Sequence, residues 1–370
     1  MAGSWSVSWA FTEFLVVLLS LPVIITVVRS VRSGNAVRPV AEAGPSISVV
    51  VPARNEADRL VPLLTSLRGA SDVLEVIVVD DESTDETANV ARGFGVRVLS
   101  GTSRPEGWVG KPWALRQGID VATGEWIVTL DADTRVEPTL PRALVALARR
   151  RGLALATAAG SFECPTFGAQ WIHPALLTTL VYRFGRPDSA RRPSALANGQ
   201  CMVFNRQDSI DEGYLEAVRG ELIEDVALAR WLHRKGSSVA MVDASEMLTV
   251  RMFETFGSTV SGWGRSLSMA SLQSKVASGA QLVSLATSQV LPVVFVVTGL
   301  APVAGSFLLA LRIGTLFGAR RAYVDRRVSY WLSPFADVIA WMVVALGTIR
   351  HFVGADVTWR GRSYQVRHSN

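Results

Sequence analysis

The segment Trp126-Ile-Val-Thr-Leu-Asp-Ala-Asp133 joins an apolar run to two carboxylates that are one residue apart. The run from Trp126 to Leu130 has the length and composition of a buried β-strand, so Asp131 and Asp133 lie at its exit. Carboxylates in this position can hold a hard divalent ion, Mg²⁺ or Mn²⁺, against a diphosphate. Asp-x-Asp also occurs in ordinary solvated turns, so its meaning depends on the rest of the chain.

Strand and helix patterns alternate around this segment. They predict strands at residues 47–51, 76–79, 96–99 and 126–130 and helices at residues 56–67 and 112–121. Ser83, with Glu86 three residues later, has the spacing of a capping box and predicts another helix start. The alternation predicts an α/β fold with a doubly wound, mostly parallel sheet that binds ligands at the carboxyl ends of its strands. The carboxylate pairs at 80/81 and 131/133 both fall at such ends.

The N-terminus carries a candidate membrane anchor. Residues 14–28 form an almost uninterrupted apolar run that, with residues 9–11 included, is long enough to cross a bilayer. No positive charge precedes the run, which disfavours a cleaved signal peptide. Arg29, Arg32 and Arg38 follow it, so the positive-inside rule predicts an anchor with its N-terminus outside and the next domain in the cytoplasm.

Three further apolar runs lie at residues 282–300, 302–317 and 330–353. The first two are predicted to form a hairpin hinged at residues 299–302, which returns the arginines at 320, 321, 326 and 327 to the cytoplasm. If the third run also spans, the basic tail lies outside, against the same rule. Its Pro334 and Asp337 leave a re-entrant or surface helix open. Residues 253–275 are amphipathic, which fits either an interfacial helix or a core-packed one.

The net charge of +5 is concentrated at the C-terminus. Residues 312–370 carry nine arginines and three aspartates, a surplus of +6. Arginines beside apolar runs face anionic headgroups, and the aromatic-plus-basic pattern of a nucleic-acid reader is missing, so no nucleic-acid partner is expected. The two cysteines, Cys164 and Cys201, have no metal-like spacing, in keeping with a reduced, cytoplasmic setting.

These patterns divide the chain into six parts. They are an N-terminal transmembrane anchor (1–32), a linker (33–45), a catalytic domain (46–252), an amphipathic interfacial segment (253–280), C-terminal membrane helices (281–353) and a basic tail (354–370). The expected location is the cell membrane, with several spans and the catalytic domain in the cytoplasm.

Four motifs resemble, in order and spacing, those of family 2 glycosyltransferases with the GT-A fold. They are Ile47-Ser-Val-Val-Val-Pro-Ala-Arg-Asn-Glu56, Val78-Val-Asp-Asp-Glu-Ser-Thr-Asp85, Asp131-Ala-Asp133 and Ile223-Glu-Asp-Val226. The resemblance covers about residues 46–270. Two shorter stretches, Gly107-Trp-Val-Gly-Lys-Pro-Trp-Ala114 and Trp359-Arg-Gly-Arg-Ser-Tyr364, are similar to membrane-bound members associated with hopanoid and carotenoid glycosylation.

The resemblance implies a nucleotide-sugar site. It puts the backbone of Pro52 and Ala53 and the side chains of Arg54 and Glu56 around the nucleoside. It makes Asp81 the carboxylate that accepts a hydrogen bond from the base. The structural alternatives are a first-turn helix acid for Glu56 and a turn acid for Asp81.

Lys111 is one of only three lysines, against 34 arginines. It lies at a predicted helix start, where a cation and free backbone N–H groups can both meet a phosphate, so we interpret it as a diphosphate contact. The alternative is a solvated surface lysine. By the resemblance, Asp133 is the direct ligand of the divalent metal, with Asp131 nearer the ribose or bridging to the metal through water.

The resemblance also implies an acceptor side. Asp225, beside Glu224, is the implied general base, and the alternative is a helix-start acid pair. The loop Asn198-Gly199-Gln200 resembles the acceptor-side glycine loop, in which Gly199 permits close backbone approach. His173 and His233 are interpreted as structural.

One departure from the family pattern concerns its processive members, which carry Gln/Arg-x-x-Arg-Trp after the base. The segment Thr259-Val-Ser-Gly-Trp263 keeps only the tryptophan, and Arg265 is the candidate substitute for the missing arginine. The departure argues against polymer synthesis and for transfer of a single sugar.

The expected function is inverting, metal-dependent transfer of one hexose from a nucleotide sugar, with a UDP-sugar as the expected donor. The expected acceptor is a hydroxyl of a polyprenoid, carotenoid or hopanoid lipid. Inversion follows from a residue set with one base and no carboxylate nucleophile. Two alternatives stay open: a polyprenyl-phosphate acceptor, which hardly needs a base, and a non-catalytic membrane scaffold with a nucleotide-binding fold. A Rossmann dehydrogenase is disfavoured because no Gly-x-Gly-x-x-Gly follows the first strand.

Overall fold

A computed structural model describes residues 2–30, 36–40, 44–185, 197–267, 269–355, 357–359 and 362–364. Parts of the expected linker and of the expected basic tail lie outside these residues. The central element is a seven-stranded sheet in the order β3-β2-β1-β4-β8-β6-β9. Its strands are β1 (Ile47–Ala53), β2 (Val73–Asp80), β3 (Arg97–Ser100), β4 (Trp126–Leu130), β6 (Leu155–Ala159), β8 (Cys201–Asn205) and β9 (Val239–Asp243).

The expected doubly wound, mostly parallel sheet is confirmed. Strand β8 is antiparallel to both of its neighbours, whereas the other pairings in this sheet are parallel. Side chains alternate across β1, so Val49 and Val51 pack on one face and Val50 on the other. The first face is covered by α2 (Ala57–Leu67), α3 (Thr87–Gly93) and α5 (Leu140–Arg151), and the second by α4 (Gly110–Val121), α8 (Tyr214–Ala217) and α9 (Glu224–Arg234).

One edge of the sheet gathers the functional segments. The carboxyl ends of β1, β2 and β4 lie there, and β8 begins there because it runs in the opposite direction. Leu130 at the end of β4 pairs with Cys201 at the start of β8. The N–H of Asp131 donates to the carbonyl oxygen of Gln200 over 3.0 Å. The Asp131–Asp133 turn and the loop before β8 are therefore neighbours.

A second, three-stranded sheet extends this edge. It has the order β5-β10-β7, with β5 at Thr134–Val136, β7 at Ser161–Glu163 and β10 at Leu248–Arg251. Strand β5 directly follows Asp133, and the carbonyl oxygen of Asp133 accepts from the N–H of Arg251 over 2.9 Å. The backbone of Asp133 is thus fixed by a strand rather than held in a free turn. Helix α7 (Arg206–Asp211) follows β8, and a separate hairpin joins β11 (Val357–Trp359) to β12 (Arg362–Tyr364).

The predicted capping box at Ser83 is wrong. Helix α3 begins four residues later, at Thr87, with Glu86 as N-cap and no side-chain capping bond. The hydroxyl of Ser83 instead accepts from the N–H of Asn55, and the amide oxygen of Asn55 accepts from the N–H of Thr84 over 2.8 Å. The segment after β2 therefore stabilises the loop after β1 through hydrogen bonds. These tertiary contacts override the local capping pattern.

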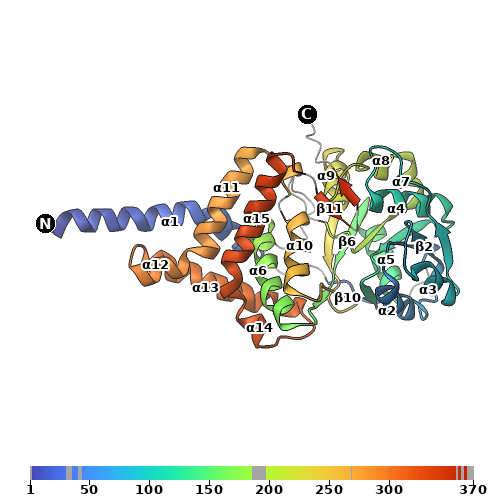
Figure 1. Cartoon of the computed structure of the whole chain (residues 1–370), viewed down its shortest axis with the longest axis horizontal. Helices are drawn as coiled ribbons and strands as arrows, with labels where there is room; N and C mark the ends of the chain where they lie inside the picture. Colours follow the sequence, from blue (N-terminus) through green and yellow to red (C-terminus); the bar gives the residue numbers. More distant parts are fainter. Residues whose placement is uncertain are drawn as a thin grey trace.

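A helical bundle packs beside the sheet domain, and its helices α6 and α10 are on the side that faces the sheet (Figure 1). The bundle contains α1 (Ala2–Ser30), α6 (Phe167–Phe184), α10 (Phe256–Ser266), α11 (Lys275–Leu285), α12 (Pro292–Thr298), α13 (Pro302–Ala319), α14 (Val328–Trp331) and α15 (Asp337–Phe352). Short 3-10 turns cover Ala270–Leu272, Arg320–Ala322 and Ser333–Ala336, and a π-helical turn covers Ala286–Val290. Buried residues of α1, α6, α11 and α15 form one apolar cluster.

Three helices are long and apolar enough to cross a membrane: Trp9–Ser30, Pro302–Ala322 and Ser333–Phe352. A fourth candidate is the pair Lys275–Val290 and Pro292–Thr298, which is bent by 55° at its break. The expected hairpin between the apolar runs at residues 282–300 and 302–317 is present, because α12 and α13 pack together around Gly299, whose φ is 68°. Helix α10 packs against α6 and α15 and buries Thr259 and Gly262, so packing within the bundle accounts for its apolar face.

We expect Gly124→Ala to destabilise the sheet domain by about 1–3 kcal/mol, the usual cost of overpacking. A Cβ at this position would lie 2.5 Å from the backbone nitrogen of Ser48, an atom that strand β1 holds in place. Gly93→Ala in α3 is the matched control, because its Cβ would meet nothing within 4 Å and alanine favours a helix. The unfolding midpoint of the purified protein should fall for Gly124→Ala and stay or rise for Gly93→Ala. Equal midpoints for the two variants would contradict the packing argument.

Candidate active site

A cavity of about 1760 Å³ opens at this edge of the sheet. Its wall contains every side chain that the sequence singled out for the donor, the metal, the base and the acceptor. These are Pro52, Ala53, Arg54, Glu56, Asp81, Lys111, Asp131, Asp133, Asn198, Gly199, Gln200, Glu224, Asp225, Trp263 and Arg265. Residues more than two hundred positions apart in the sequence, such as Pro52 and Arg265, therefore line the same cavity. Their individual roles stay predictions.

Lys111 is the centre of the charged cluster. It lies in the first turn of α4, as expected, and its ammonium contacts Asp131 Oδ1 at 2.8 Å and Glu224 Oε1 at 2.9 Å. It also donates to the carbonyl oxygen of Gly199 over 3.2 Å. Burial opposes the charge of Lys111, but Asp131 and Glu224 outweigh burial and raise its pKa above the ordinary value. Lys111 therefore stays charged and holds the DxD turn, the loop before β8 and the start of α9 together.

Asp225 is held by two backbone donors. Its Oδ2 accepts from the N–H of Gly199 over 2.6 Å, and its Oδ1 accepts from its neighbour Val226 over 2.8 Å. Loss of water and the charge of the adjacent Glu224 together raise the pKa of Asp225 to about 7, although Lys111 and the two N–H groups act to lower it. A carboxylate with a pKa near 7 can both accept and release a proton at neutral pH. Glu224 itself is buried and engaged by Lys111.

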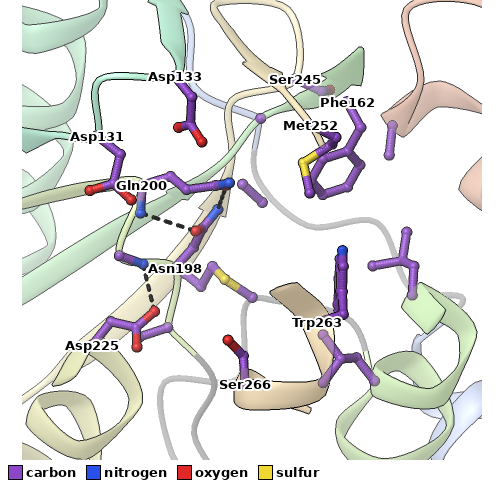
Figure 2. A pocket seen from close by; sticks show the side chains of 18 of the residues that line it. Asp131, Asp133, Phe162, Asn198, Gln200, Asp225, Ser245, Met252, Trp263 and Ser266 are labelled. Atoms are coloured by element: carbon purple, nitrogen blue, oxygen red, sulfur yellow. Dashed lines mark hydrogen bonds between the residues drawn. The ribbon is translucent and has the colours of Figure 1, made fainter. Parts of the chain in front are cut away.

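Asp133 has a different environment from Asp131. Its Oδ1 is buried and has no hydrogen-bond partner among the described residues, whereas Asp131 is bound by Lys111. Loss of water, together with the charges of Asp131 and Glu56, raises the pKa of Asp133 to about 7. A buried carboxylate oxygen without a donor is a place where a cation fits. Figure 2 shows Asp131 and Asp133 on one side of the Asn198–Gln200 loop and Asp225 on the other.

The described residues contain no group of three or more His, Cys, Asp or Glu side chains that could hold a metal by themselves. The carboxylates of Asp133 and Asp131 suit Mg²⁺ or Mn²⁺ bound together with a nucleotide. Such ions take one or two carboxylates from the protein and complete their coordination with phosphate oxygens and water.

Another part of the cavity wall, separate from the Lys111 cluster, is built from the loops after β1 and β2. The Arg54 guanidinium donates to the carbonyl oxygen of Asp81 over 2.6 Å, and Asp81 is only 6% exposed. Asn55 and Glu82, which flank this pair, have φ of 54° and 55°. A left-handed conformation is uncommon for Glu and costs energy, and such strain gathers at functional sites. This end of the cavity is therefore a shaped, rigid pocket.

The loop before β8 has little freedom. The Asn198 side chain donates to Gln200 Oε1 over 2.9 Å and accepts from the N–H of Gln200 over 3.1 Å. A Cβ on Gly199 would lie 3.1 to 3.2 Å from Glu224, Lys111 and Asp225. A side chain at this position would therefore crowd these three charged groups, and the acceptor-side role of the loop stays a prediction.

Trp263 and Arg265 reach the cavity from α10. The Trp263 ring lies 5.0 Å from that of His173, in an edge-on arrangement, and its own edge faces Phe162 and Met252 (Figure 2). His173 is fully buried and bonded to Tyr323, as a structural histidine should be. The sequence did not single out the cavity residues from α6 and α13, because those helices carry no motif and reach the site through long-range packing.

A mixed α/β sheet of this topology, with a carboxylate pair directly after β4, defines a GT-A glycosyltransferase fold. A mannosyltransferase from Pyrobaculum calidifontis, solved with GDP-Man and Mn²⁺, shares it with a TM-score of 0.51 at 15% identity, covering 91% of this chain and 99% of that chain. Residues 48–213 match the family model described as Glycosyl transferase family 2 and form a domain of that family.

Two relatives carry the same description, 4,4'-diaponeurosporenoate glycosyltransferase. The protein of Staphylococcus haemolyticus (strain JCSC1435) is 30% identical over 240 residues, which cover 62% of this chain and 62% of that protein. The protein of Staphylococcus aureus (strain MRSA252) is 29% identical over 229 residues, which cover 60% of this chain and 61% of that protein. The chain thus matches less than two thirds of the length of these relatives.

Proposed function

We propose that the protein is an inverting, metal-dependent glycosyltransferase of the cell membrane. It moves one hexose from a UDP-sugar to a hydroxyl of a polyprenoid, carotenoid or hopanoid lipid at the cytoplasmic face. The observation that carries the proposal is that Asp225, with a pKa of about 7, and the unpartnered carboxylate oxygen of Asp133 share one cavity. The family 2 domain and the names of the relatives support sugar transfer.

The proposed roles combine the family resemblance with the arrangement of these residues around one cavity. Arg54, Asp81 and the backbone of Pro52 and Ala53 form the nucleoside end of the cavity. Asp133, with Asp131 beside it, would hold the divalent ion, which supplies positive charge to the diphosphate as the nucleotide leaves. The fit rests on the orphaned oxygen of Asp133. Lys111 adds a second, permanent positive charge next to the same turn.

Asp225 acts on the acceptor. It removes the proton from the lipid hydroxyl as the oxygen forms a bond to the anomeric carbon. The bond from that carbon to the diphosphate breaks, and its electron pair leaves with the nucleotide. A single displacement inverts the anomeric configuration. The N–H groups of Gly199 and Val226 keep Asp225 oriented, and the Lys111 ammonium engages the neighbouring Glu224.

The membrane assignment rests on the three candidate spans and on their basic flanks. Arg29 lies in the last turn of the first, and Arg320 and Arg321 lie at the end of the second. The positive-inside rule then puts the sheet domain in the cytoplasm, where nucleotide sugars are available. The test is to incubate membranes that contain the protein with a panel of radiolabelled nucleotide sugars and to extract the lipid. Lipid-soluble label from one UDP-sugar is the expected result, and no lipid-soluble label from any donor would refute the proposal.

The rate of transfer should rise with pH and level off above about pH 7. Asp225 works as a base only when ionised, and its raised pKa means that the protonated form dominates at lower pH. The measurement is kcat/KM for the lipid acceptor between about pH 5 and 9, with donor and metal saturating. Parallel measurement of nucleotide affinity separates the base from any pH effect on donor binding. A profile that is flat across this range would remove Asp225 as the base.

A further inference from the structure

The cavity is larger than its donor end requires. Its volume of about 1760 Å³ exceeds the roughly 300–1,000 Å³ of a typical small-molecule site. The surplus continues from Asp225 and Trp263 into the junction between the sheet domain and the helical bundle. Its walls there come from the end of α1 (Val27), from α6 (Leu177, Leu180 and Val181) and from α13 (Leu311 and Gly314). We name this part the apolar arm.

The apolar arm leads from the catalytic residues into the candidate membrane spans. Ala310 and Arg320, at its two ends on α13, are ten residues apart, which is about 15 Å of helix. Arg320, Arg321 and Arg326 line the cavity at the end nearer the sheet domain, and apolar side chains line it farther along α13. A charged rim at one end and an apolar wall at the other match an amphipathic molecule that lies partly in a bilayer.

The α13 wall of the apolar arm is also unfilled. A Cβ built on Gly314 or on Gly318 would meet no atom within 4 Å, although both residues lie in a helix of the bundle. Gly305, earlier in the same helix, differs: its Cβ would lie 2.9 Å from Phe295 of α12. Close helix packing therefore accounts for Gly305 and does not account for Gly314. Gly314 is exposed and lines the cavity, so a side chain added there would have room to extend into the arm.

We infer that the apolar arm binds the hydrocarbon chain of an isoprenoid acceptor, which enters between α6 and α13 with its hydroxyl directed toward Asp225. Gly314 then sets how wide a chain can reach the base. The inference rests on the proposed function for the identity of the acceptor. The continuity of the arm with the cavity that holds Asp225 favours the acceptor over a bystander phospholipid, because only the acceptor must deliver a polar end to that residue.

The test uses the full-length protein in nanodiscs and two readouts. First, Gly314→Leu should lower transfer to a long-chain isoprenoid alcohol on the order of 100-fold, since each methylene kept out of the arm costs about fourfold in affinity. Transfer to geraniol, a short acceptor with the same hydroxyl, and affinity for UDP should change little. Gly279→Leu on α11 is the matched control, because its Cβ also meets nothing within 4 Å and Gly279 does not line the cavity.

The second readout needs neither turnover nor a folded variant. A diazirine-labelled long-chain isoprenoid alcohol should cross-link the unaltered protein on peptides of α6 and α13. Cross-links to α6 and α13 without any sugar transfer would support binding of the isoprenoid chain in the apolar arm and would reject the proposed function. Unchanged transfer to the long-chain alcohol by Gly314→Leu, or cross-links confined to other helices, would overturn the inference that the apolar arm binds the acceptor chain. This holds whether or not the protein proves to transfer a sugar. Displacement of the probe by phospholipid alone would assign the arm to bulk lipid and equally overturn the inference.

Discussion

Asp225→Asn is expected to lower kcat for sugar transfer by about 10²–10⁴-fold, the range for loss of a positioned general base. The change keeps the size of the side chain but removes its ability to take a proton. Binding of the UDP-sugar should be nearly unchanged, because Asp225 belongs to the acceptor side of the cavity. The measurements are single-turnover transfer to extracted lipid and donor affinity by calorimetry.

The amide has a second effect that the experiment must separate. Asp225 accepts from two backbone N–H groups, those of Gly199 and Val226, and an asparagine can accept from only one of them. An unfolding midpoint within a few degrees of the unaltered protein shows that the loop has survived. Gly199 is then still in place, and the loss of rate is due to the missing proton acceptor at position 225.

A loss of kcat below about tenfold in Asp225→Asn would indicate that the acceptor does not need a general base. A phosphate or carboxylate acceptor is already ionised and needs no base. Asp225→Asn therefore distinguishes a hydroxyl acceptor from an ionised one. The raised pKa of Asp225 favours the hydroxyl, because a carboxylate that only positioned its neighbours would gain nothing from a pKa of about 7.

Local pattern was sufficient to predict β1, β2, β3 and β4 of the seven-stranded sheet, but it did not predict β6, β8 or β9. Strands such as β4 are continuous apolar runs that end in a polar residue, and this is the pattern of a strand buried on both faces. The rule that ligands bind at the carboxyl ends of parallel strands then places the carboxylate pairs at 80/81 and 131/133 at one edge of the sheet. The antiparallel entry of β8 brings the Asn198–Gln200 loop to the same edge.

The parts that sequence did not predict depend on tertiary contacts. The predicted cap at Ser83 is wrong because the Ser83 hydroxyl accepts from the N–H of Asn55 in the loop after β1. Asp85 instead accepts from the N–H groups of Ala57 and Thr87, the first residues of α2 and α3. Lys111 was interpreted from its type and position as a phosphate contact, but its bonds to Asp131 and Glu224 join residues 20 and 113 positions away. The α6 helix has a low amphipathic signal because it is buried against several helices at once, so nothing marked it as the coupling between sheet and bundle.

Asp133→Asn is expected to reduce transfer on the order of 10³-fold or more. The ion that neutralises the departing diphosphate is worth several kcal/mol, and each 1.4 kcal/mol is a factor of ten in rate. An amide is a poor ligand for Mg²⁺ or Mn²⁺, and Asp131 cannot compensate, because both of its oxygens are engaged by Lys111. Direct titration with Mn²⁺, followed by electron paramagnetic resonance in the presence of UDP, gives a readout that does not depend on turnover.

The matched control for this change is Asp120→Asn, which removes a carboxylate of similar chemistry from an exposed pair with Arg116 on α4. That pair is worth little to stability, so Mn²⁺ binding and transfer should both survive. The pattern that supports Asp133 as the ligand is loss of Mn²⁺ binding in Asp133→Asn alone, with UDP affinity lowered only when the metal is present. If Asp133→Asn still bound Mn²⁺ with unaltered affinity, the ion would have to be held elsewhere, and the orphaned oxygen of Asp133 would need another partner.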